Sequence, residues 1–207
     1  LSHAGSNNYS EVRNLELDAS GLSDVFIDAG AGALTVKGVE GSDRIFVIAT
    51  IMVDREDDGE ARELIEKRLR LELERDGDRA KLKAGFRSGW GWDGDAAIDL
   101  DVRMPAQLLL RIDDGSGPVK VQDIASAVRI DDGSGPIELS NSGEIDIDDG
   151  SGSIRLEDTG GVRIDDGSGS ITIIRAAGDV YVEDGSGTID IRGVQGSVTV
   201  DDGSGDI

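Results

Sequence analysis

Several residue types are scarce in this sequence of 207 residues, and each shortage excludes a class of site. There is no cysteine and only one histidine, His3. The lack of cysteine excludes disulfides and thiolate metal sites. Because His3 lies in a terminal segment that we expect to be flexible (residues 1–11), catalytic triads and metal sites built on imidazole are excluded as well.

Positive charge and long apolar runs are also scarce. Lysine and arginine total 21 against 43 aspartates and glutamates, which gives a net charge of -22. A field of that sign repels the phosphates of nucleic acids and the surfaces of anionic membranes. The longest apolar run, residues 45–53, is far shorter than the roughly 20 residues that cross a bilayer. We therefore expect no nucleic-acid partner and no direct membrane insertion.

The first residues of the chain bear on its location. Residues 1–10 are mostly small and polar, and the chain starts at Leu1 without an initiator methionine. A mature protein whose signal peptide has been removed has this pattern, although a chain trimmed at its start has it too. We expect an exported protein, in the periplasm, on the cell surface or secreted.

A pentapeptide recurs six times in the second half of the chain. It reads Asp-Asp-Gly-Ser-Gly, with Glu in place of the first Asp in one copy, and the start positions of successive copies differ by 17 or 18. A fixed short period indicates one structural unit stacked on copies of itself. The copies are residues 113–117, 131–135, 148–152, 165–169, 183–187 and 201–205.

Between these copies, apolar and polar residues alternate. One unit has Val128, Ile130, Ile137 and Leu139 at its apolar positions. Period-two alternation in β-branched runs is typical of strands with one buried face, so each unit carries two short strands and a Gly-Ser-Gly corner. Antiparallel hairpins would explain the turns but do not require a constant full period. The sequence therefore predicts an all-β fold, a parallel β-solenoid with coils of about 17–18 residues.

The first half of the chain holds a degenerate copy of the unit, residues 26–36, and then an interruption. The interruption reads as a long strand, a helix that Asp57 or Asp58 can cap, and a hairpin that either caps the tube or packs on its side. The expected bounds are a flexible start at 1–11, one solenoid domain at 12–207, an insertion at 42–96 with a helix at 56–67 and a hairpin at 68–85, and regular coils at 97–207.

These features together resemble the bacterial putative-adhesin family, a domain of unknown function built from β-strand repeats. The resemblance covers most of the chain and rests on three elements: aliphatic strands around Gly-Ser-Gly corners (as in 130–137), an acidic helix followed by a hairpin (56–84), and a proline-containing lead-in (102–105). Because members of that family are mostly envelope-associated or exported, it implies a cell-envelope or exported protein. The coils alone also resemble bactofilins, which polymerise through a short β-solenoid.

The acidic corners are the first candidate site. Stacked corners lie about 4.8 Å apart, where like charges disfavour each other's ionisation. Calcium prefers carboxylate and carbonyl oxygens and would relieve this repulsion. The alternative is an Asx-type turn with carboxylates exposed to water, since turns alone select Asp and Gly. The predicted calcium ligands are Asp114, Asp132, Asp149, Asp166, Asp184 and Asp202.

The second candidate site is the Gly-rich loop at residues 87–94, which holds both tryptophans, Trp90 and Trp92. Tryptophan on such a loop can stack on a sugar ring or anchor a partner. Both rings can also fold back to cover the hairpin or the end of the tube. We predict a ligand or partner contact at these two residues and no cofactor other than calcium.

Three functions remain open. The first is a non-catalytic exported or cell-envelope β-solenoid, an adhesin-like interaction or structural module with a protein or glycan partner at the cell surface. The second is a self-associating scaffold whose solenoid ends stack. The third is a polysaccharide-active enzyme that uses carboxylate pairs as acid and base. We expect no enzyme, because repetitive exposed acids lack the distinct environment that catalysis needs.

Overall fold

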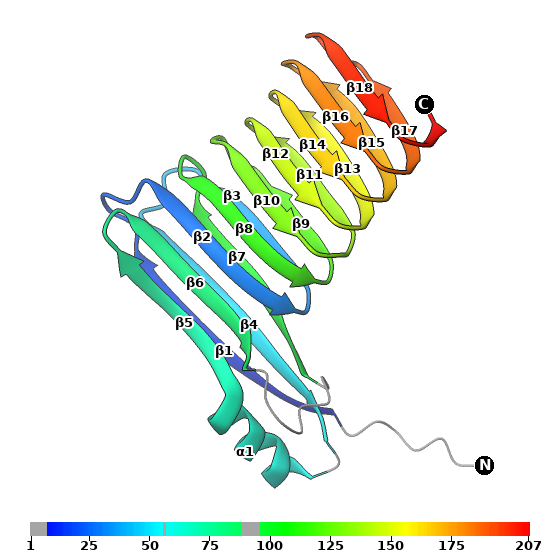
Figure 1. The fold of residues 1–207 in the computed structure, drawn as a ribbon. Coiled ribbons are helices and arrows are strands. Elements are labelled where there is room, and N and C mark those ends of the chain that lie inside the picture. Colours follow the sequence, from blue (N-terminus) through cyan, green and yellow to red (C-terminus); the bar gives the residue numbers. More distant parts are fainter. Residues whose placement is uncertain (1–7, 56, 88–95) are drawn as a thin grey trace, which may run out of the picture.

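The computed structural model describes residues 8–55, 57–87 and 96–207. Apart from one helix, the regular structure of these residues is β-strand, and the strands form two sheets that face each other (Figure 1). In the described residues, one sheet has ten strands in the order β1-β4-β7-β3-β9-β11-β13-β15-β17-β19. The other has nine, in the order β18-β16-β14-β12-β10-β8-β2-β6-β5. Most neighbouring strands run parallel.

The repeat region (residues 109–206) alternates between the two sheets. Equivalent strands of successive units pair in parallel, so that Ile130 lies beside Ile147 in one sheet and Ile137 beside Ile154 in the other. The nine-stranded sheet receives β8 (Leu109–Ser116), β10 (Val128–Asp132), β12 (Ile145–Asp149), β14 (Val162–Asp166), β16 (Val180–Asp184) and β18 (Val198–Asp202). The ten-stranded sheet receives β9 (Val119–Gln122), β11 (Ile137–Ser142), β13 (Gly152–Thr159), β15 (Gly169–Ala176), β17 (Gly187–Arg192) and β19 (Gly205–Asp206).

The degenerate copy of the unit takes its predicted place beside these strands. It forms β2 (Asp24–Ala31) and β3 (Leu34–Val39). Ile27 pairs in register with Ile112 of β8, and Leu34 with Val119 of β9. A unit from the start of the chain therefore stacks directly on the first regular unit, although the intervening residues build five further elements.

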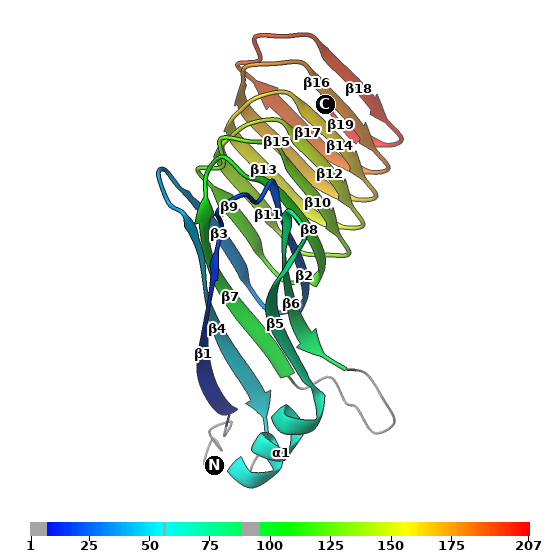
Figure 2. The same ribbon diagram turned by 90° about the vertical axis from the view of Figure 1, so that its left-hand side faces the viewer.

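Those further elements extend both sheets beyond β2 and β3 (Figure 2). β6 and β7 run parallel to β2 and β3 and make one more unit, whereas β1, β4 and β5 add antiparallel strands at the end. The hairpin of β5 and β6 therefore extends the nine-stranded sheet beyond β2. The bounds are β1 (Asn8–Asp18), β4 (Arg44–Asp54), α1 (Asp58–Arg68), β5 (Leu69–Asp76), β6 (Arg79–Phe86) and β7 (Ala96–Pro105).

The outermost strands of the two sheets, β1 and β5, are tied to each other. The Nη2 atom of Arg75 on β5 donates to the backbone carbonyls of Asp18 (3.1 Å) and Ser20 (2.7 Å). This link joins the outer edges of the two sheets at the Asp18 end of β1. Helix α1 connects β4 to β5, and its first turn is capped by Asp57, whose Oδ1 accepts from the backbone N–H of Gly59 and Glu60.

Aliphatic side chains fill the space between the sheets. Each unit of the repeat region points two of them inward from each sheet, and those from Leu110 to Ile189 are at most 4 % exposed. Burying one such side chain stabilises the fold by about 1.5–3 kcal/mol. Because the unit repeats in register, these side chains stack as columns along the whole region.

The two corners of the unit differ in which residues have a positive φ. At the Gly-Ser-Gly corner the positive φ belongs to the second glycine, as at Gly135 (+142°). At the other corner, non-glycine residues take the left-handed conformation, as Asn141 (+53°) and Asp158 (+55°) do. Asn and Asp tolerate this region better than most residues because their side chains bond locally.

Candidate functional site

The two acidic residues of each pentapeptide face opposite sides of the nine-stranded sheet. Alternation along β10 places Asp131 on the outer face and Asp132 between the sheets, and the neighbouring units repeat this pattern in register. The outer acidic column consists of Asp113, Asp131, Asp148, Asp165, Glu183 and Asp201. The inner aspartate ladder consists of Asp114, Asp132, Asp149, Asp166, Asp184 and Asp202.

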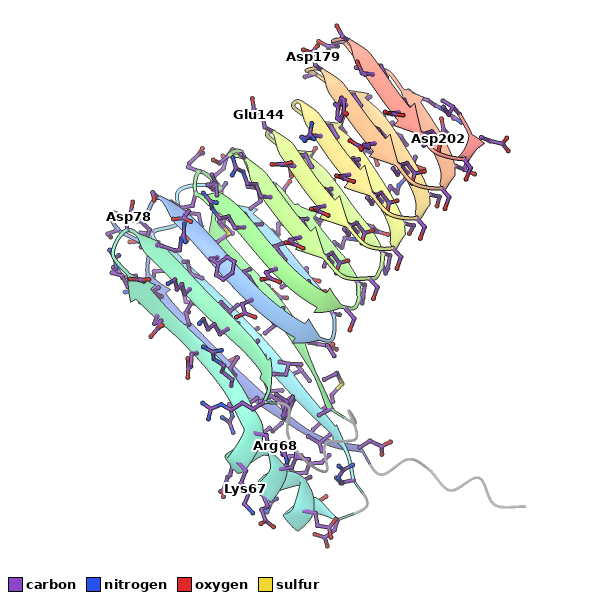
Figure 3. The ribbon with its side chains drawn as sticks, in the orientation of Figure 1. Lys67, Arg68, Asp78, Glu144, Asp179 and Asp202 are labelled. Atoms are coloured by element: carbon purple, nitrogen blue, oxygen red, sulfur yellow. The ribbon has the colours of Figure 1, made fainter. Side chains whose placement is uncertain are left out.

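The inner aspartate ladder is deeply buried. Its members from Asp114 to Asp184 are 1–3 % exposed, and Asp202, in the last unit, is partly exposed; Figure 3 shows Asp202 at that end of the nine-stranded sheet. In the units from Asp132 onward, one carboxylate oxygen, Oδ1, accepts from the backbone N–H of the serine two residues later, at 3.0–3.3 Å. This bond is the Asx-type turn that the sequence predicted.

The second oxygen of each buried carboxylate has no such partner. Among the described residues, the Oδ2 atoms of Asp132, Asp149, Asp166 and Asp184, and both oxygens of Asp114, make no hydrogen bond. The expectation of carboxylates exposed to water therefore holds for the outer acidic column but is wrong for the inner ladder, because the strand alternation that buries Ile130 also turns Asp132 inward. A buried carboxylate with an unpaired oxygen favours its neutral form.

Burial raises the pKa values of the ladder. Burial, followed by repulsion from the neighbouring Asp132, raises the pKa of Asp114 to about 7. Burial, followed by repulsion from Asp166, raises the pKa of Asp149 to about 6. Burial also raises the pKa of Asp132, Asp166 and Asp184, against the lowering effect of their turn hydrogen bonds. At mildly acidic pH, Asp114 and Asp149 therefore hold protons that exposed aspartates would release.

A bound cation, like a proton, would offset the negative charge on these unpaired carboxylate oxygens. Within the described ranges, no group of three or more Asp, Glu, His or Cys side chains is arranged to hold a metal ion. The ladder instead presents single carboxylates at the spacing of neighbouring strands, about 4.8 Å. The calcium assignment stays a prediction.

If the ladder takes up calcium, millimolar Ca²⁺ at pH 8 will raise the melting temperature of metal-stripped protein at fixed ionic strength, because a ligand of the folded state stabilises it. Asp149→Asn should abolish the shift, whereas Asp148→Asn, which alters the outer column, should leave it. Mg²⁺ is the matched control ion. An equal shift with both ions, or its loss only in Asp148→Asn, would contradict calcium binding at the ladder.

The tryptophan prediction falls outside the described residues, since Trp90 and Trp92 lie in the segment 88–95. Among the described residues, β6 ends in one sheet and β7 begins in the other on the side where the repeats have their Gly-Ser-Gly corner. The sequence analysis missed this equivalence, because residues 79–105 carry no Gly-Ser-Gly corner.

Basic side chains gather on the same end of the molecule, and sequence reasoning missed them as a group. A groove of about 490 Å³ lies along the end of β6, lined by residues of β2, β5 and β6 and by Ala96 at the start of β7. Its lining includes Arg70, Lys83 and Arg87 together with Asp28. The available signal was the period-two placement of 83, 85 and 87 on one strand face.

Comparisons with known proteins find likeness in structure only. No protein-family model and no curated protein matches the chain. The fold is similar to a solved "putative cell adhesion protein" from Clostridium sporogenes ATCC 15579, with 12 % identity, a TM-score of 0.42, and coverage of 95 % of this chain and 100 % of that one.

Two further solved structures come from Parabacteroides. A "putative lipid binding protein" from Parabacteroides distasonis ATCC 8503 has 13 % identity, a TM-score of 0.36 and 98 % coverage of both chains. A "putative adhesin" from Parabacteroides merdae ATCC 43184 has 10 % identity, a TM-score of 0.28, and coverage of 95 % of this chain and 96 % of that one. These likenesses are too distant to assign a function. Within the described residues, no helix is long and apolar enough to span a membrane.

Proposed function

We propose that the chain is a non-catalytic, exported or cell-envelope β-solenoid, with coils of about 17–18 residues, which acts as an adhesin-like interaction module. One observation carries this proposal. The outer acidic column repeats one carboxylate per unit, in register, along the outer face of the nine-stranded sheet. A regular array of identical groups on parallel strands is a surface that can bind a repetitive partner at several points at once.

The chemistry of the column indicates the kind of partner. Its carboxylates are spaced by one strand, about 4.8 Å, and are flanked by a second outward row that contains Arg111, Arg129 and Arg163. Arg129 lies 3.9 Å from Asp146 of the next unit, so part of this second row is internally paired. The outer acidic column is therefore the row that would contact a cell-surface protein or glycan that presents basic groups.

The raised pKa values do not favour the enzyme alternative. Perturbed carboxyls often mark catalytic sites, but Asp114 and Asp149 are at most 3 % exposed between the sheets, where a polysaccharide cannot reach them. The same environment also recurs in neighbouring units. A glycosidase instead needs one acid and one base in different environments beside a cleft.

Binding to arrays of immobilised matrix proteins and surface glycans tests the proposal. We expect the purified chain to bind a subset of the array, and the variant Asp131→Asn/Asp148→Asn/Asp165→Asn to lose at least 10-fold in affinity, about 1.4 kcal/mol. The control variant Glu138→Gln/Glu157→Gln/Asp190→Asn removes the same charge from the ten-stranded sheet and should bind like the original protein.

Three outcomes would contradict this function. Equal loss in both variants would show that only net charge matters. A molecular mass that rises with concentration in light scattering would favour the self-stacking scaffold. Release of reducing sugar from an array glycan would favour the polysaccharide-active enzyme.

A further inference from the structure

The hairpin formed by β5 and β6 differs in charge from the rest of the molecule. Residues 68–87 hold seven of the 21 basic side chains of the chain beside only four acidic ones. This segment runs from Arg68, the last residue of α1, to the turn at Asp78 and back (Figure 3). Because the whole protein has a net charge of -22, this hairpin is a positively charged region of an otherwise negatively charged protein.

Most basic side chains of the hairpin have structural partners. Arg79 donates to Asp24 at 2.6 Å, and Lys81 pairs with Asp76. Arg68 donates to the backbone carbonyl of Arg87, and Arg75 to the carbonyls at the end of β1. These contacts hold the hairpin in place, so these four side chains are not available to a ligand.

The remaining three basic side chains are the ones that line the groove. Arg70 has only a distant ion pair, 3.7 Å from Glu72, and its side chain is 40 % exposed. Within the described residues, the ammonium of Lys83 and the guanidinium of Arg87 form no ion pair. Three cationic side chains with a weak ion pair, or with none among the described residues, therefore line one groove. Their N–H groups can donate hydrogen bonds to an anion bound there.

Glycines make the floor of this depression. Lys83 and Gly85 lie on the outer face of β6, Arg87 follows the end of that strand, and Arg70 of β5 pairs with Gly85. Among the described residues, no atom lies within 4 Å of a Cβ added at Gly85. Gly30 of β2 lies beside it, with the nearest atoms to its own Cβ position at 3.7 Å. The result is a flat backbone floor with a cationic rim.

We propose that this groove binds an acidic sugar, with the carboxylate of a uronic acid held by Lys83, Arg87 and Arg70 and its hydroxyls donating to Asp28. Asp28 lies beside Lys83 in register and lines the same groove. A carboxylate on the rim repels a bare anion but accepts from sugar hydroxyls. The volume of about 490 Å³ lies within the range of small-ligand sites.

The surroundings favour a sugar unit over a long polyanion or a membrane. Beyond the groove, the outer face of the same sheet carries Asp113 and the acidic column, which repel extended anionic chains and anionic lipid surfaces. A short or sparsely charged glycan brings only one anionic group to the rim. This site goes beyond the proposed function and uses none of the acidic column.

Titration of ¹⁵N-labelled protein with glucuronate, followed by NMR, tests the site. We expect the amide signals of Gly85 and Gly30 to shift to saturation with a dissociation constant on the order of 1 mM. Lys83→Gln should weaken binding about 10-fold, whereas Lys81→Gln, on the same strand face but paired with Asp76, should not. Uncharged glucose should cause no saturable shift.

Asp28→Ala separates a sugar site from a simple anion site. It should weaken glucuronate binding and strengthen the binding of sulfate, because the removed carboxylate accepts from hydroxyls and repels a bare anion. Absence of shifts with glucuronate, equal effects of Lys83→Gln and Lys81→Gln, or equal binding of sulfate and glucuronate would overturn the proposal. So would tighter binding to anionic lipid vesicles. None of these results affects the binding assigned to the acidic column, whose residues stay intact.

Discussion

We expect the free energy of unfolding to fall as the pH rises from about 4 to about 8. The cause is the inner aspartate ladder, whose members at Asp114 and Asp149 have pKa values of about 7 and about 6 in the folded state. In the unfolded chain an aspartate titrates near 3.9. Between these values the folded state binds more protons than the unfolded state, so stability decreases with rising pH. For Asp149 alone, a shift of about two units corresponds to about 3 kcal/mol.

Exposed ion pairs change the free energy of unfolding in a different pH range. The guanidinium of Arg175 lowers the pKa of Asp158 by hydrogen bonding. Such a pair adds stability above the unfolded pKa and loses it as the pH falls through the lower folded pKa. Its effect is therefore confined to pH below about 4, and the decline between pH 4 and 8 belongs to the ladder.

Urea unfolding at a series of pH values measures this dependence. Asp149→Asn keeps an oxygen that accepts from Ser151 and removes the ionisable group, so we expect it to be more stable than the original protein at pH 8 by about 1–3 kcal/mol. Asp148→Asn, one residue away on the outer face, is the matched control and should leave most of the slope unchanged. A flat profile between pH 4 and 8, or equal effects of the two variants, would show that the ladder is not protonated.

The second large effect is expected from Gly135→Ala. A Cβ at this position would lie 2.0 Å from the carbonyl oxygen of Gly117 in the preceding unit, and the φ of +142° disfavours any residue with a side chain. The backbone must move, which disturbs the bond from the Gly135 amide to the carbonyl of Ser151. We expect a loss of about 3 kcal/mol or more.

Gly161→Ala is the control for this substitution. Its added Cβ would meet only the carbonyl oxygen of Asp179, at an ordinary contact distance of 3.6 Å. We expect less than about 1 kcal/mol of change from it. Both variants are compared by urea unfolding at one pH. Equal stabilities would mean that successive units are not packed at the described distance.

The parallel pairing of the units could be predicted because a constant period fixes the register. Residues 26–36 were recognised as a copy from their glycine-rich corner and apolar alternation, and the structure shows that they pair with β8 and β9. The unit formed by β6 and β7 was read as half a hairpin and a lead-in. Local alternation identifies strands such as β6, but it does not tell which distant strand lies beside them, and the corner sequence that would have done so is absent there.

The orientation of the acidic residues was within reach of the sequence. Ile130 is an inward position, so the residue two places later, Asp132, has the same parity and faces inward as well. The preference of aspartate for exposed turns argued the other way and was wrong at this corner. The local pattern places Lys83 and Arg87 on one strand face, but it could not predict the whole groove. Arg70 of β5 and Asp28 of β2 join them only through the order of the strands in the sheet.

The placement of β2 and β3 has a consequence for how the chain reaches this structure during synthesis. The strand that contains Ile27 can pair with the strand that contains Ile112 only after about 85 further residues have been synthesised. The first unit therefore leaves the ribosome with an unsatisfied strand edge, and closing so long a loop slows its pairing. Each later unit has its neighbour only one repeat away along the chain, so these units can add one by one. We therefore expect pairing of the amino-terminal unit to be the slow step of folding, and the later units to pair quickly in order toward the carboxyl terminus.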